Sequence, residues 1–573
     1  MNSGNFLLFL RTISYLRLEQ ILYRVWYAIR VRCSSRLCSD SHNIPDGIDW
    51  IPLKPDTPFL SYAWWDDNEI ARGCFCFLNE TIEYGADVNW QAQDRGRLWR
   101  YNLHYFQYLH PKGGLDSDIG LRLIRHWVDH NPPGAKDAWD PFPISLRLVN
   151  WIKYLSNISL PKTESKPLVL SAYQQALWLE RSFEYHLLGN HLFKNAKALV
   201  FSGLFFKGPD AERWLAKGLR LLNQEISEQI LSDGGHFERS PMYHSMILED
   251  CLDLLNVCKP QPHSDLKNLS GQLQKVCKKM VVFLKAMTHP DDRISLFNDA
   301  AFGIEAEPTD LIKYYKRITG ESIPEDKDSV CSFPDTGYYV LKPTPDSRML
   351  IDCGSIGPDY QPGHAHCDTL SFELSLKGRR VIVDSGCFEY EDGSIRQYNR
   401  GNAGHNTLTI DGQNQSEVWE AHRCARRARP LYANLNKEPD GSLVFEGAHD
   451  GYKRLKGKPI HHRRIRWFGD KCLIEDRVEG KGHHEIESRL HIHPSLSVDY
   501  TGEEIIVRDE QDMLVRITLP GNGRIEKTEG WYCPEFGIKK PCVVLTTIHK
   551  NVPLPFKCGW IFNIHKAKTL SDE

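Results

Sequence analysis

The chain has 573 residues, a formal net charge of −3, 41% hydrophobic and 25% charged residues, and it contains 15 Trp, 23 Tyr and 24 Phe. This composition excludes a disordered protein and provides material for large cores and aromatic-lined clefts. The charge gives no global attraction to nucleic acid or to an anionic membrane, so any anionic partner must meet a local patch. Two arginine-rich stretches, 423–429 and 461–466, are candidates for such a patch, and solvated strand faces are the alternative for each.

The N-terminal region predicts an amphipathic helix and no membrane span. The apolar run at residues 6–10 has five residues and is followed by arginine, whereas a secretory signal needs about 7–15 apolar residues. No apolar stretch reaches about 18 residues, the length needed for a transmembrane helix. Residues 16–32 mix Leu, Ile, Val and Trp with Arg and Glu, which predicts a helix that docks on the body of the protein. A membrane-surface role is the alternative.

Two longer regions differ in the period of their apolar residues. Between about 86 and 330 the period is three to four residues, and the sequence predicts helices at 118–130, 141–157, 167–183, 190–206, 209–231, 240–258 and 268–288. Consecutive helices without strands between them predict helix-on-helix packing as a bundle, solenoid or ring. From 331 to 573 the period is two, which indicates an antiparallel sandwich. Residues 1–85 are expected to form an N-terminal extension, and a ligand site is expected at the interface of the two domains.

In the helical region, two helix starts carry polar residues. Asn190 follows a glycine and suits an N-cap, and His191 beside it is a packing residue on the simplest interpretation. Ser240 and Pro241 predict another helix start, with Ser240 as the N-cap. Tyr243 then lies in the first turn, where the positive end of the helix dipole modestly favours a phenolate. A tyrosine that acts as a base needs this charge state.

Histidines and carboxylates also gather in the strand region, as in acid–base or metal sites; they are His364, His366, Asp384 and His405. The metal interpretation meets a geometric difficulty. If the segments on either side of Gly378 form a hairpin, Asp384 lies roughly 20 Å along the strand from His366, at ~3.3 Å per residue. The chain would have to fold back before Thr369, for which Pro362–Gly363 is suggestive but insufficient.

The order of these motifs resembles that of a known family. The heparinase II/III-like polysaccharide lyases, which include heparan-sulfate lyases and oligoalginate lyases, carry similar motifs in the same order as Asn190-His191, the run from Gly234 to Tyr243, His364-Ala-His366, Asp384-Ser-Gly and Gly404-His405-Asn406-Thr407. The resemblance covers roughly residues 90–430. It implies an incomplete α/α toroid followed by a large antiparallel β-sandwich, which agrees with the change of period.

The resemblance implies β-elimination on a uronic-acid-containing polysaccharide. The C5 proton of a uronate is weakly acidic, so such an enzyme neutralises the adjacent carboxylate, stabilises enolate-like charge and supplies a base and an acid. By matching positions, Asn190 and His364 would neutralise the carboxylate, with His191 assisting. Tyr243 would take the C5 proton or protonate the leaving glycosidic oxygen.

The resemblance also implies a metal and a set of sugar contacts. His366, Asp384 and His405 match the ligands of a structural divalent metal, usually zinc, that fixes the loop carrying His364. Substrate contacts, for which core packing is the alternative, are expected at Trp99, Tyr101, His104, Trp139, Arg147, Glu238, Arg239, Tyr398 and Arg400. The partner is then an acidic polysaccharide or oligosaccharide and not nucleic acid. Secreted members of the family are periplasmic, whereas the absence of a recognisable signal peptide leaves the cytoplasm as the alternative.

Two other functions remain open. A glycoside hydrolase on a helical toroid needs two carboxylates across the cleft, for which Glu238 and Asp140 are the candidates. A non-catalytic carbohydrate-binding or assembly protein would keep the cleft without turnover. Products with unsaturated ends distinguish the lyase from both, because a hydrolase gives saturated reducing ends and a binding protein gives no product.

Overall fold

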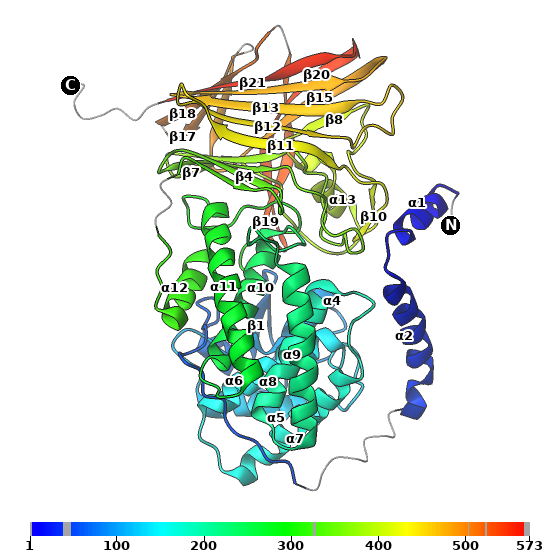
Figure 1. Ribbon diagram of the computed structural model, residues 1–573, viewed down its shortest axis with the longest axis vertical. Coiled ribbons are helices and arrows are strands. Elements are labelled where there is room, and N and C mark those ends of the chain that lie inside the picture. Colours follow the sequence, from blue (N-terminus) through cyan, green and yellow to red (C-terminus); the bar gives the residue numbers. More distant parts are fainter. Residues whose placement is uncertain are drawn as a thin grey trace, which may run out of the picture.

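The computed structural model describes residues 3–37, 47–324, 328–501, 504–510, 512–521 and 524–565. Figure 1 shows a body of helices below a body of strands, with the N-terminal helices along one side. The two bodies are an incomplete α/α toroid and a large antiparallel β-sandwich, as the family resemblance implies. Within these described ranges, no helix is both long enough and apolar enough to cross a bilayer.

The toroid packs its helices around buried aromatic side chains such as Trp127. Local signals set the helix starts. Asp116 caps one helix by accepting a backbone hydrogen bond, and Ser240 caps another, where Pro241 takes the first position and the Tyr243 backbone donates to the Ser240 hydroxyl. The helices are α4 (Arg97–Tyr105), η2 (Gln107–Leu109), α5 (Ser117–His130), α6 (Pro141–Asn157), α7 (Lys162–Glu180), α8 (Gly189–Phe205), α9 (Pro209–Gln229), α10 (Pro241–Cys258), α11 (Ser264–Met287) and α12 (Pro308–Thr319).

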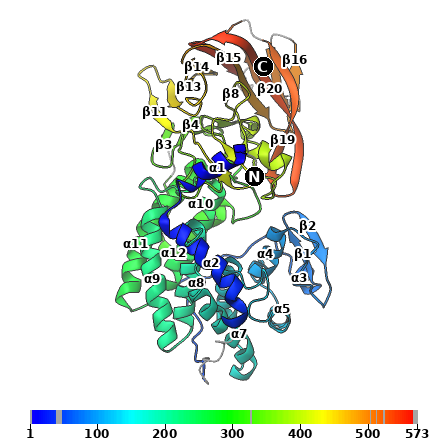
Figure 2. The ribbon, with the colours of Figure 1, turned by 90° about the vertical axis from the view of Figure 1, so that its right-hand side faces the viewer.

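The structure divides the N-terminal region into two parts. Helices α1 (Ser3–Ile13) and α2 (Leu18–Leu37) run along the outside of the toroid and up to the sandwich, as Figure 2 shows. The helix expected at 16–32 is α2. Residues 47–85, with α3 (Asp67–Ala71), β1 (Cys74–Phe77) and β2 (Glu80–Glu83), pack instead into the toroid core through side chains such as Tyr62 and Phe75. The toroid therefore recruits residues that precede position 86.

The sandwich contains two large antiparallel sheets. Its strands are β3 (Val330–Phe333), β4 (Tyr338–Thr344), β5 (Ser347–Asp352), β6 (Phe372–Leu376), β7 (Arg379–Ile382), β8 (Leu408–Ile410), β11 (Pro430–Lys437), β12 (Leu443–His449), β13 (Ile460–Phe468), β14 (Lys471–Glu479), β15 (His483–Ile492), β16 (Ser497–Tyr500), β17 (Glu504–Asp509), β18 (Asp512–Thr518), β19 (Ile525–Glu535), β20 (Ile538–Pro553) and β21 (Phe556–Ile564). One sheet has the order β11-β12-β13-β14-β21-β18-β17-β16, and the other β19-β20-β15-β7-β6-β5-β4-β3, with β8 paired to β15. Inward residues such as Phe372 and Trp560 form the core between the sheets.

Buried charges join the sandwich to the toroid. Glu373 on β6 lies 2.7 Å from the His289 ring just beyond α11, and neither side chain has exposed surface. Arg380 on β7 binds both Glu373 and Asp291. The hydrogen bond between Glu373 and His289 and the ion pair between Arg380 and Asp291 both cross the interface, and they fix how the two domains meet. A helix, α13 (Ser394–Arg400), a short η3 turn (Asn402–Gly404) and two short strands, β9 (Val418–Trp419) and β10 (Arg423–Cys424), lie on the sandwich side of this interface.

Candidate active site

A cleft with a volume of about 1220 Å³ lies between the toroid and the sandwich. The toroid contributes α4, α6, α8 and α10, the sandwich contributes the loops at 360–364 and 388–391, and α1 and α2 contribute one wall. The four predicted catalytic residues all line this cleft: Asn190, His191, Tyr243 and His364. The structure therefore brings together residues that are far apart in the sequence.

Asn190 lies inside the first turn of α8, so the expectation that it is an N-cap is wrong. Leu188, with φ of 65°, holds the cap position. The Asn190 backbone N–H donates to the buried Glu238 carboxylate at 2.9 Å, and its side-chain amide donates to both carboxylate oxygens at 3.0 and 2.9 Å. A Cβ on Gly189 would lie 2.5 Å from Glu238 Oε1 and 2.0 Å from Gln361 Oε1, so only glycine permits this contact. Asn190 Oδ1 is buried without a hydrogen-bond partner.

His191 is held by a carboxylate from the segment that precedes α8. Its Nδ1 lies 3.1 Å from Glu184 Oε1, and the other Glu184 oxygen accepts from Asn195. Burial lowers the pKa of His191, but the adjacent Glu184 charge outweighs burial, and the net pKa is raised. The cleft therefore contains an imidazole that keeps its proton to higher pH than an exposed histidine.

Tyr243 and His364 pack ring against ring across the domain interface, with 3.9 Å between centroids. The Tyr243 hydroxyl lies 3.0 Å from the hydroxyl of Tyr390. Burial raises the pKa of Tyr243 well above its usual range, and the hydrogen bond with Tyr390 offsets this only in part. The helix dipole was expected to favour the Tyr243 phenolate. Burial outweighs this effect, because the free-energy cost of desolvating a phenolate exceeds the stabilisation that a helix N-terminus provides. Sequence reasoning missed Tyr390, which no recognisable motif marks.

Asp299 binds both His364, which was predicted to contact substrate, and His366, which was predicted to bind a metal. Its carboxylate binds His364 Nδ1 at 3.0 Å, His366 Nε2 at 2.8 Å and Arg396 Nη2 at 2.8 Å. Burial raises the pKa of Asp299, but the Arg396 charge and the histidine hydrogen bonds bring the net pKa well below its usual range. The ionised carboxylate therefore orients both rings. Asp299 lies in a toroid loop without a sequence signature, and sequence reasoning missed it.

The predicted metal ligands do come together. His366, Asp384 and His405 are buried and each offers a ligand atom, all within 4.8 Å of one another. The distance difficulty disappears because the chain turns at residues 368–371, where the Ser371 N–H donates to the Asp368 carbonyl and Leu370 has φ of 67°. A second hydrogen-bonded turn lies at the position that the sequence suggested, where the Ala365 N–H donates to the Pro362 carbonyl at 3.3 Å.

The donor set of this cluster fits a metal. His366 Nε2 is hydrogen-bonded to Asp299, and His405 Nδ1 lies 2.7 Å from Asp384 Oδ2. The other nitrogen of each ring, Nδ1 of His366 and Nε2 of His405, is buried without a hydrogen-bond partner. A carboxylate outside the ligand set on one nitrogen and a free lone pair on the other is the arrangement of metal-binding histidines, and Asp299 gives His366 this arrangement.

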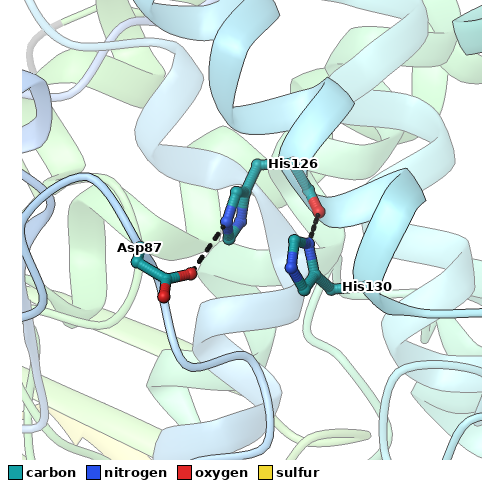
Figure 3. Close-up of side chains that lie close together, drawn as sticks. All are labelled: Asp87, His126 and His130. Atoms are coloured by element: carbon teal, nitrogen blue, oxygen red, sulfur yellow. Dashed lines mark hydrogen bonds and ion pairs between the residues drawn. The ribbon is translucent and has the colours of Figure 1, made fainter.

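A second group of possible ligands does not fit as well. Figure 3 shows Asp87, His126 and His130 close together at the edge of the toroid. Trp90 donates its indole N–H to His126 Nδ1 at 2.8 Å, so the neutral His126 ring carries its proton on Nε2, which faces Asp87 at 3.2 Å. Since both His126 nitrogens are engaged, this histidine has no lone pair for a metal.

Comparison with known proteins agrees with this fold and site. Residues 67–327 match the model of the heparinase II/III N-terminus, and residues 326–561 match that of the heparinase II/III-like C-terminal region. The chain belongs to the heparinase II/III-like family. The matched regions of this family member exclude α1 and α2, which precede residue 67.

Among its relatives are two proteins named heparin-sulfate lyase. The chain is 24% identical over 470 residues to that of Bacteroides stercoris, covering 70% of this chain and 65% of the relative, and 25% identical over 412 residues to that of Pedobacter heparinus, covering 62% and 60%. It thus spans less than two thirds of the length of these relatives. A solved heparinase III has a TM-score of 0.64 at 20% identity, covering 88% of this chain and 82% of its own. Another, the BT4657 gene product, has a TM-score of 0.63 at 17% identity, covering 90% and 87%.

In this heparinase II/III-like toroid, three expected substrate contacts lie in the core. His104 accepts the Trp127 indole N–H at 3.0 Å, and the Trp139 indole donates to a backbone carbonyl. Arg147 is fully buried and donates to Gln175 and to two backbone carbonyls. Because their polar groups are satisfied inside the protein, these three side chains do not face the cleft. The core-packing alternative holds for them.

Three residues near the sandwich that were expected to contact substrate also make their polar contacts within the protein. Arg239 donates to the carbonyls of residues 335 and 336, Tyr398 contacts the His491 ring, and Arg400 donates to carbonyls of residues 365, 420 and 423. None of the three lines the cleft among the described residues. Arg400 instead supports the loop between His364 and His366.

Three expected contacts remain at or beside the cleft. Tyr101 and Trp99 line it, although the Trp99 side chain is buried and donates to the Glu80 carbonyl. Glu238 lies directly behind Asn190. Asp140, the other carboxylate considered for a hydrolase, also lines the cleft and accepts hydrogen bonds from Tyr101 and Arg97.

Proposed function

We propose that the protein is a polysaccharide lyase that cleaves a uronic-acid-containing polysaccharide by β-elimination. The observation that carries the proposal is the meeting of Asn190, His191, Tyr243 and His364 in one cleft, from two domains, each oriented by a neighbouring residue. The relatives named heparin-sulfate lyases support the same reaction class.

Neutralisation of the substrate carboxylate is assigned to Asn190, His191 and His364. His191 retains a positive charge through Glu184, and it therefore attracts a carboxylate. The buried Oδ1 of Asn190 has no partner within the protein, and it accepts a hydrogen bond from the substrate carboxyl group once that group has taken the proton of the His191 imidazolium. These contacts strengthen as the C5 proton leaves and charge moves onto the carboxylate, so they favour the transition state over the ground state.

The proton transfers are assigned to Tyr243 with Tyr390. The C5–H electrons form the C4–C5 double bond, the C4–O bond breaks, and the leaving oxygen takes a proton. One hydroxyl of the tyrosine pair takes the C5 proton as its own proton passes along the 3.0 Å hydrogen bond to the other tyrosine, whose proton in turn goes to the leaving oxygen. The accepting oxygen has phenolate character only during this transfer. Both tyrosines begin and end as phenols, which agrees with the effect of burial in raising both pKa values.

A divalent metal, zinc by its ligand preference, is proposed at His366, Asp384 and His405. Two imidazoles and a carboxylate suit this ion, and the two partnerless ring nitrogens are the supporting observation. When bound, the metal would supply structural cross-linking. Asp299 would couple that cross-link to His364, because it binds His366 and His364 together.

The proposed substrate is unsulfated or sparsely sulfated. Most cations along the described cleft lining are already paired with acids, for example Lys194 with Asp250, Lys153 with Asp253, and Arg97 with Asp140. A densely sulfated chain needs many free arginine or lysine groups, whereas Arg24, which donates only to a backbone carbonyl, is the one cation of this described lining without an acidic partner. A polysaccharide with one carboxylate at the cleavage position suits the cleft better.

The test is digestion of a panel of polyuronides, with absorbance in the near ultraviolet and product masses as readouts. The lyase predicts unsaturated ends, and an unsulfated polymer should be cut faster than its chemically sulfated derivative. Saturated reducing ends would decide for a hydrolase that uses Glu238 and Asp140. Glycan binding without any product over long incubation would decide for a binding protein.

A further inference from the structure

The N-terminal helices form part of the cleft although they lie outside the regions that define the family. Residues 67–561 carry the family match, whereas α1 and α2 end at Leu37. The inner face of these helices lines the cleft through residues such as Ile13, Leu16, Gln20 and Arg24. Figure 2 shows the two helices crossing from the toroid to the sandwich.

Helix α2 holds two loops that precede catalytic residues. The buried Gln20 amide donates to the Leu187 carbonyl at 3.4 Å and to the Tyr360 carbonyl at 3.3 Å. Leu187 comes three residues before Asn190, and Tyr360 four residues before His364. Gln20 therefore joins a toroid loop to a sandwich loop.

Neighbouring contacts strengthen the same junction. The Arg17 guanidinium stacks on the Tyr360 ring at 3.8 Å and pairs with Glu228, which also accepts the Tyr360 hydroxyl at 2.7 Å. The Tyr27 hydroxyl donates to the Ser182 carbonyl further along α2. These contacts attach α2 and the residue before it to segments that border the site.

The geometry points to Gln20 and Arg17 as positioning residues for the proposed lyase reaction. By fixing the loops at 182–188 and 359–363 relative to each other, α2 sets the distance between Asn190 on the toroid and His364 on the sandwich. Both residues act on one substrate carboxylate in the proposed function, on which this inference rests. A displacement of about 1 Å between such groups costs roughly a hundredfold in rate.

The test compares full-length wild type with Gln20→Ala, using hydrogen exchange and kinetics. The substitution should speed amide exchange in both loops and lower kcat/KM by roughly tenfold to a hundredfold. Asn256→Ala is the matched control. It removes a buried amide that bridges the Thr57 carbonyl and a tyrosine hydroxyl, about 20 Å along α10 from Tyr243 at 1.5 Å per residue. It should lower thermal stability without changing kcat/KM.

Unchanged exchange in the two loops of Gln20→Ala, or unchanged kcat/KM, would overturn the positioning role. A wild-type protein without lyase activity would count against the proposed function instead. In that case the hydrogen-exchange measurement still tests whether Gln20 holds the two loops together, because it needs no substrate.

The outer face of the same helices carries an independent observation. Eight of the fourteen exposed large apolar side chains among the described residues lie on α1 and α2. They are Phe6, Leu7, Leu10, Leu18, Leu22, Val25, Trp26 and Ile29, with exposed fractions of 44–70%. The spacing in α2 follows one helix face, opposite the face that contacts the cleft.

The charge of this segment differs from that of the rest of the chain. Residues 3–37 contain six arginines and one glutamate, a net charge of +5, whereas the whole chain has −3. The arginine patch expected at 423–429 adjoins α1: Arg423 lies over the Phe9 ring, and Arg427 over the Tyr15 ring. An exposed apolar stripe on a segment of net positive charge is the composition of helices that lie in an anionic lipid interface.

We infer that the outer face of α1 and α2 docks on an anionic membrane surface. The apolar stripe enters the boundary between headgroups and acyl chains, and the net positive charge of residues 3–37 attracts the segment to the anionic surface. Docking leaves the inner face on the cleft, because the two faces point in opposite directions. The polysaccharide site is then held next to a lipid surface.

Co-sedimentation of the full chain with vesicles tests this inference. Wild type should bind phosphatidylcholine vesicles that contain phosphatidylglycerol and should bind pure phosphatidylcholine much less. The double variant Leu18→Glu/Leu22→Glu should bind about tenfold more weakly or less. Leu431→Glu, at a leucine on β11 that is half exposed, is the control and should bind like wild type.

No binding by wild type, or equal binding by the double variant, would overturn the membrane inference. Light scattering of the same samples addresses a competing occupant. If wild type forms dimers that Leu18→Glu/Leu22→Glu dissociates, while vesicles bind neither protein, the face is an interface between two copies of this chain and the membrane inference is wrong.

Discussion

The Tyr243 ring of the toroid lies against the His364 ring of the sandwich, with 3.9 Å between their centroids. Neither domain alone contains this pair, so the proposed chemistry depends on how the domains meet. The buried contact between Glu373 and His289 on the same interface holds that arrangement. Domain orientation is thus a requirement of the site as well as of the fold.

Removal of either hydroxyl in the tyrosine pair should reduce activity without unfolding the protein. Tyr243→Phe should lower kcat by ~10³-fold and Tyr390→Phe by ~10²-fold, since positioned acid–base groups contribute about 10²–10⁴-fold. The near-ultraviolet absorbance of the products measures the rate, and thermal unfolding is the folding control. Wild-type activity in Tyr243→Phe would remove that residue from the mechanism.

The activity should depend on pH through His191. Glu184 raises the pKa of His191 against the effect of burial, so the imidazolium is present below that pKa and is lost as pH rises through it. We expect kcat/KM to fall along that limb, because the neutral ring no longer neutralises the substrate carboxylate. In Glu184→Gln the limb should move to lower pH, and in His191→Gln it should disappear. A limb at the same pH in Glu184→Gln would contradict the assignment.

The sequence predicts the parts of the site that local rules determine. Ser240 and Pro241 define a helix start, and this placed Tyr243 correctly in the first turn. Tyr390 and Asp299 could not be predicted, because their roles come from tertiary contacts between segments far apart in the chain. Likewise, no local signal places Leu370 in the left-handed region, which leucine seldom adopts.

The sequence also did not predict which aromatic and basic residues are buried. Trp139 and Arg147 have the composition of sugar contacts, and the same residue types also fill cores. The period of the apolar residues defined the buried face of α6 only approximately, because nearly every position of that helix from Pro143 to Leu155 is buried. A helix enclosed on all sides offers no polar face from which a cleft could be inferred.

Metal content provides a test that is independent of activity. Protein purified from medium containing zinc should carry a stoichiometric amount of the ion, and His366→Ala and Asp384→Asn should lose it and unfold at lower temperature. His126→Ala is the control and should keep the metal, because both nitrogens of His126 are engaged by Trp90 and Asp87. Elemental analysis without stoichiometric metal in wild type would remove the proposal.

Arg147 should matter for stability and not for substrate binding. Its guanidinium is fully buried, stacks on Trp127 at 4.0 Å and satisfies Gln175 and two backbone carbonyls. Arg147→Met leaves those acceptors without donors, which should cost about 3 kcal/mol of unfolding free energy. Arg125→Met is the matched control, since Arg125 is exposed and lies 3.7 Å from Glu164, and should change stability by less than about 0.5 kcal/mol.

The two arginine variants are compared by urea unfolding followed through tryptophan fluorescence, and by KM measured below the unfolding transition. Arg147→Met should lower the midpoint while KM stays at the wild-type value. Tyr101→Phe, at a residue that does line the cleft, should raise KM with little change in the midpoint. If Arg147→Met has a raised KM and wild-type stability, Arg147 contacts substrate, which would contradict its position in the core.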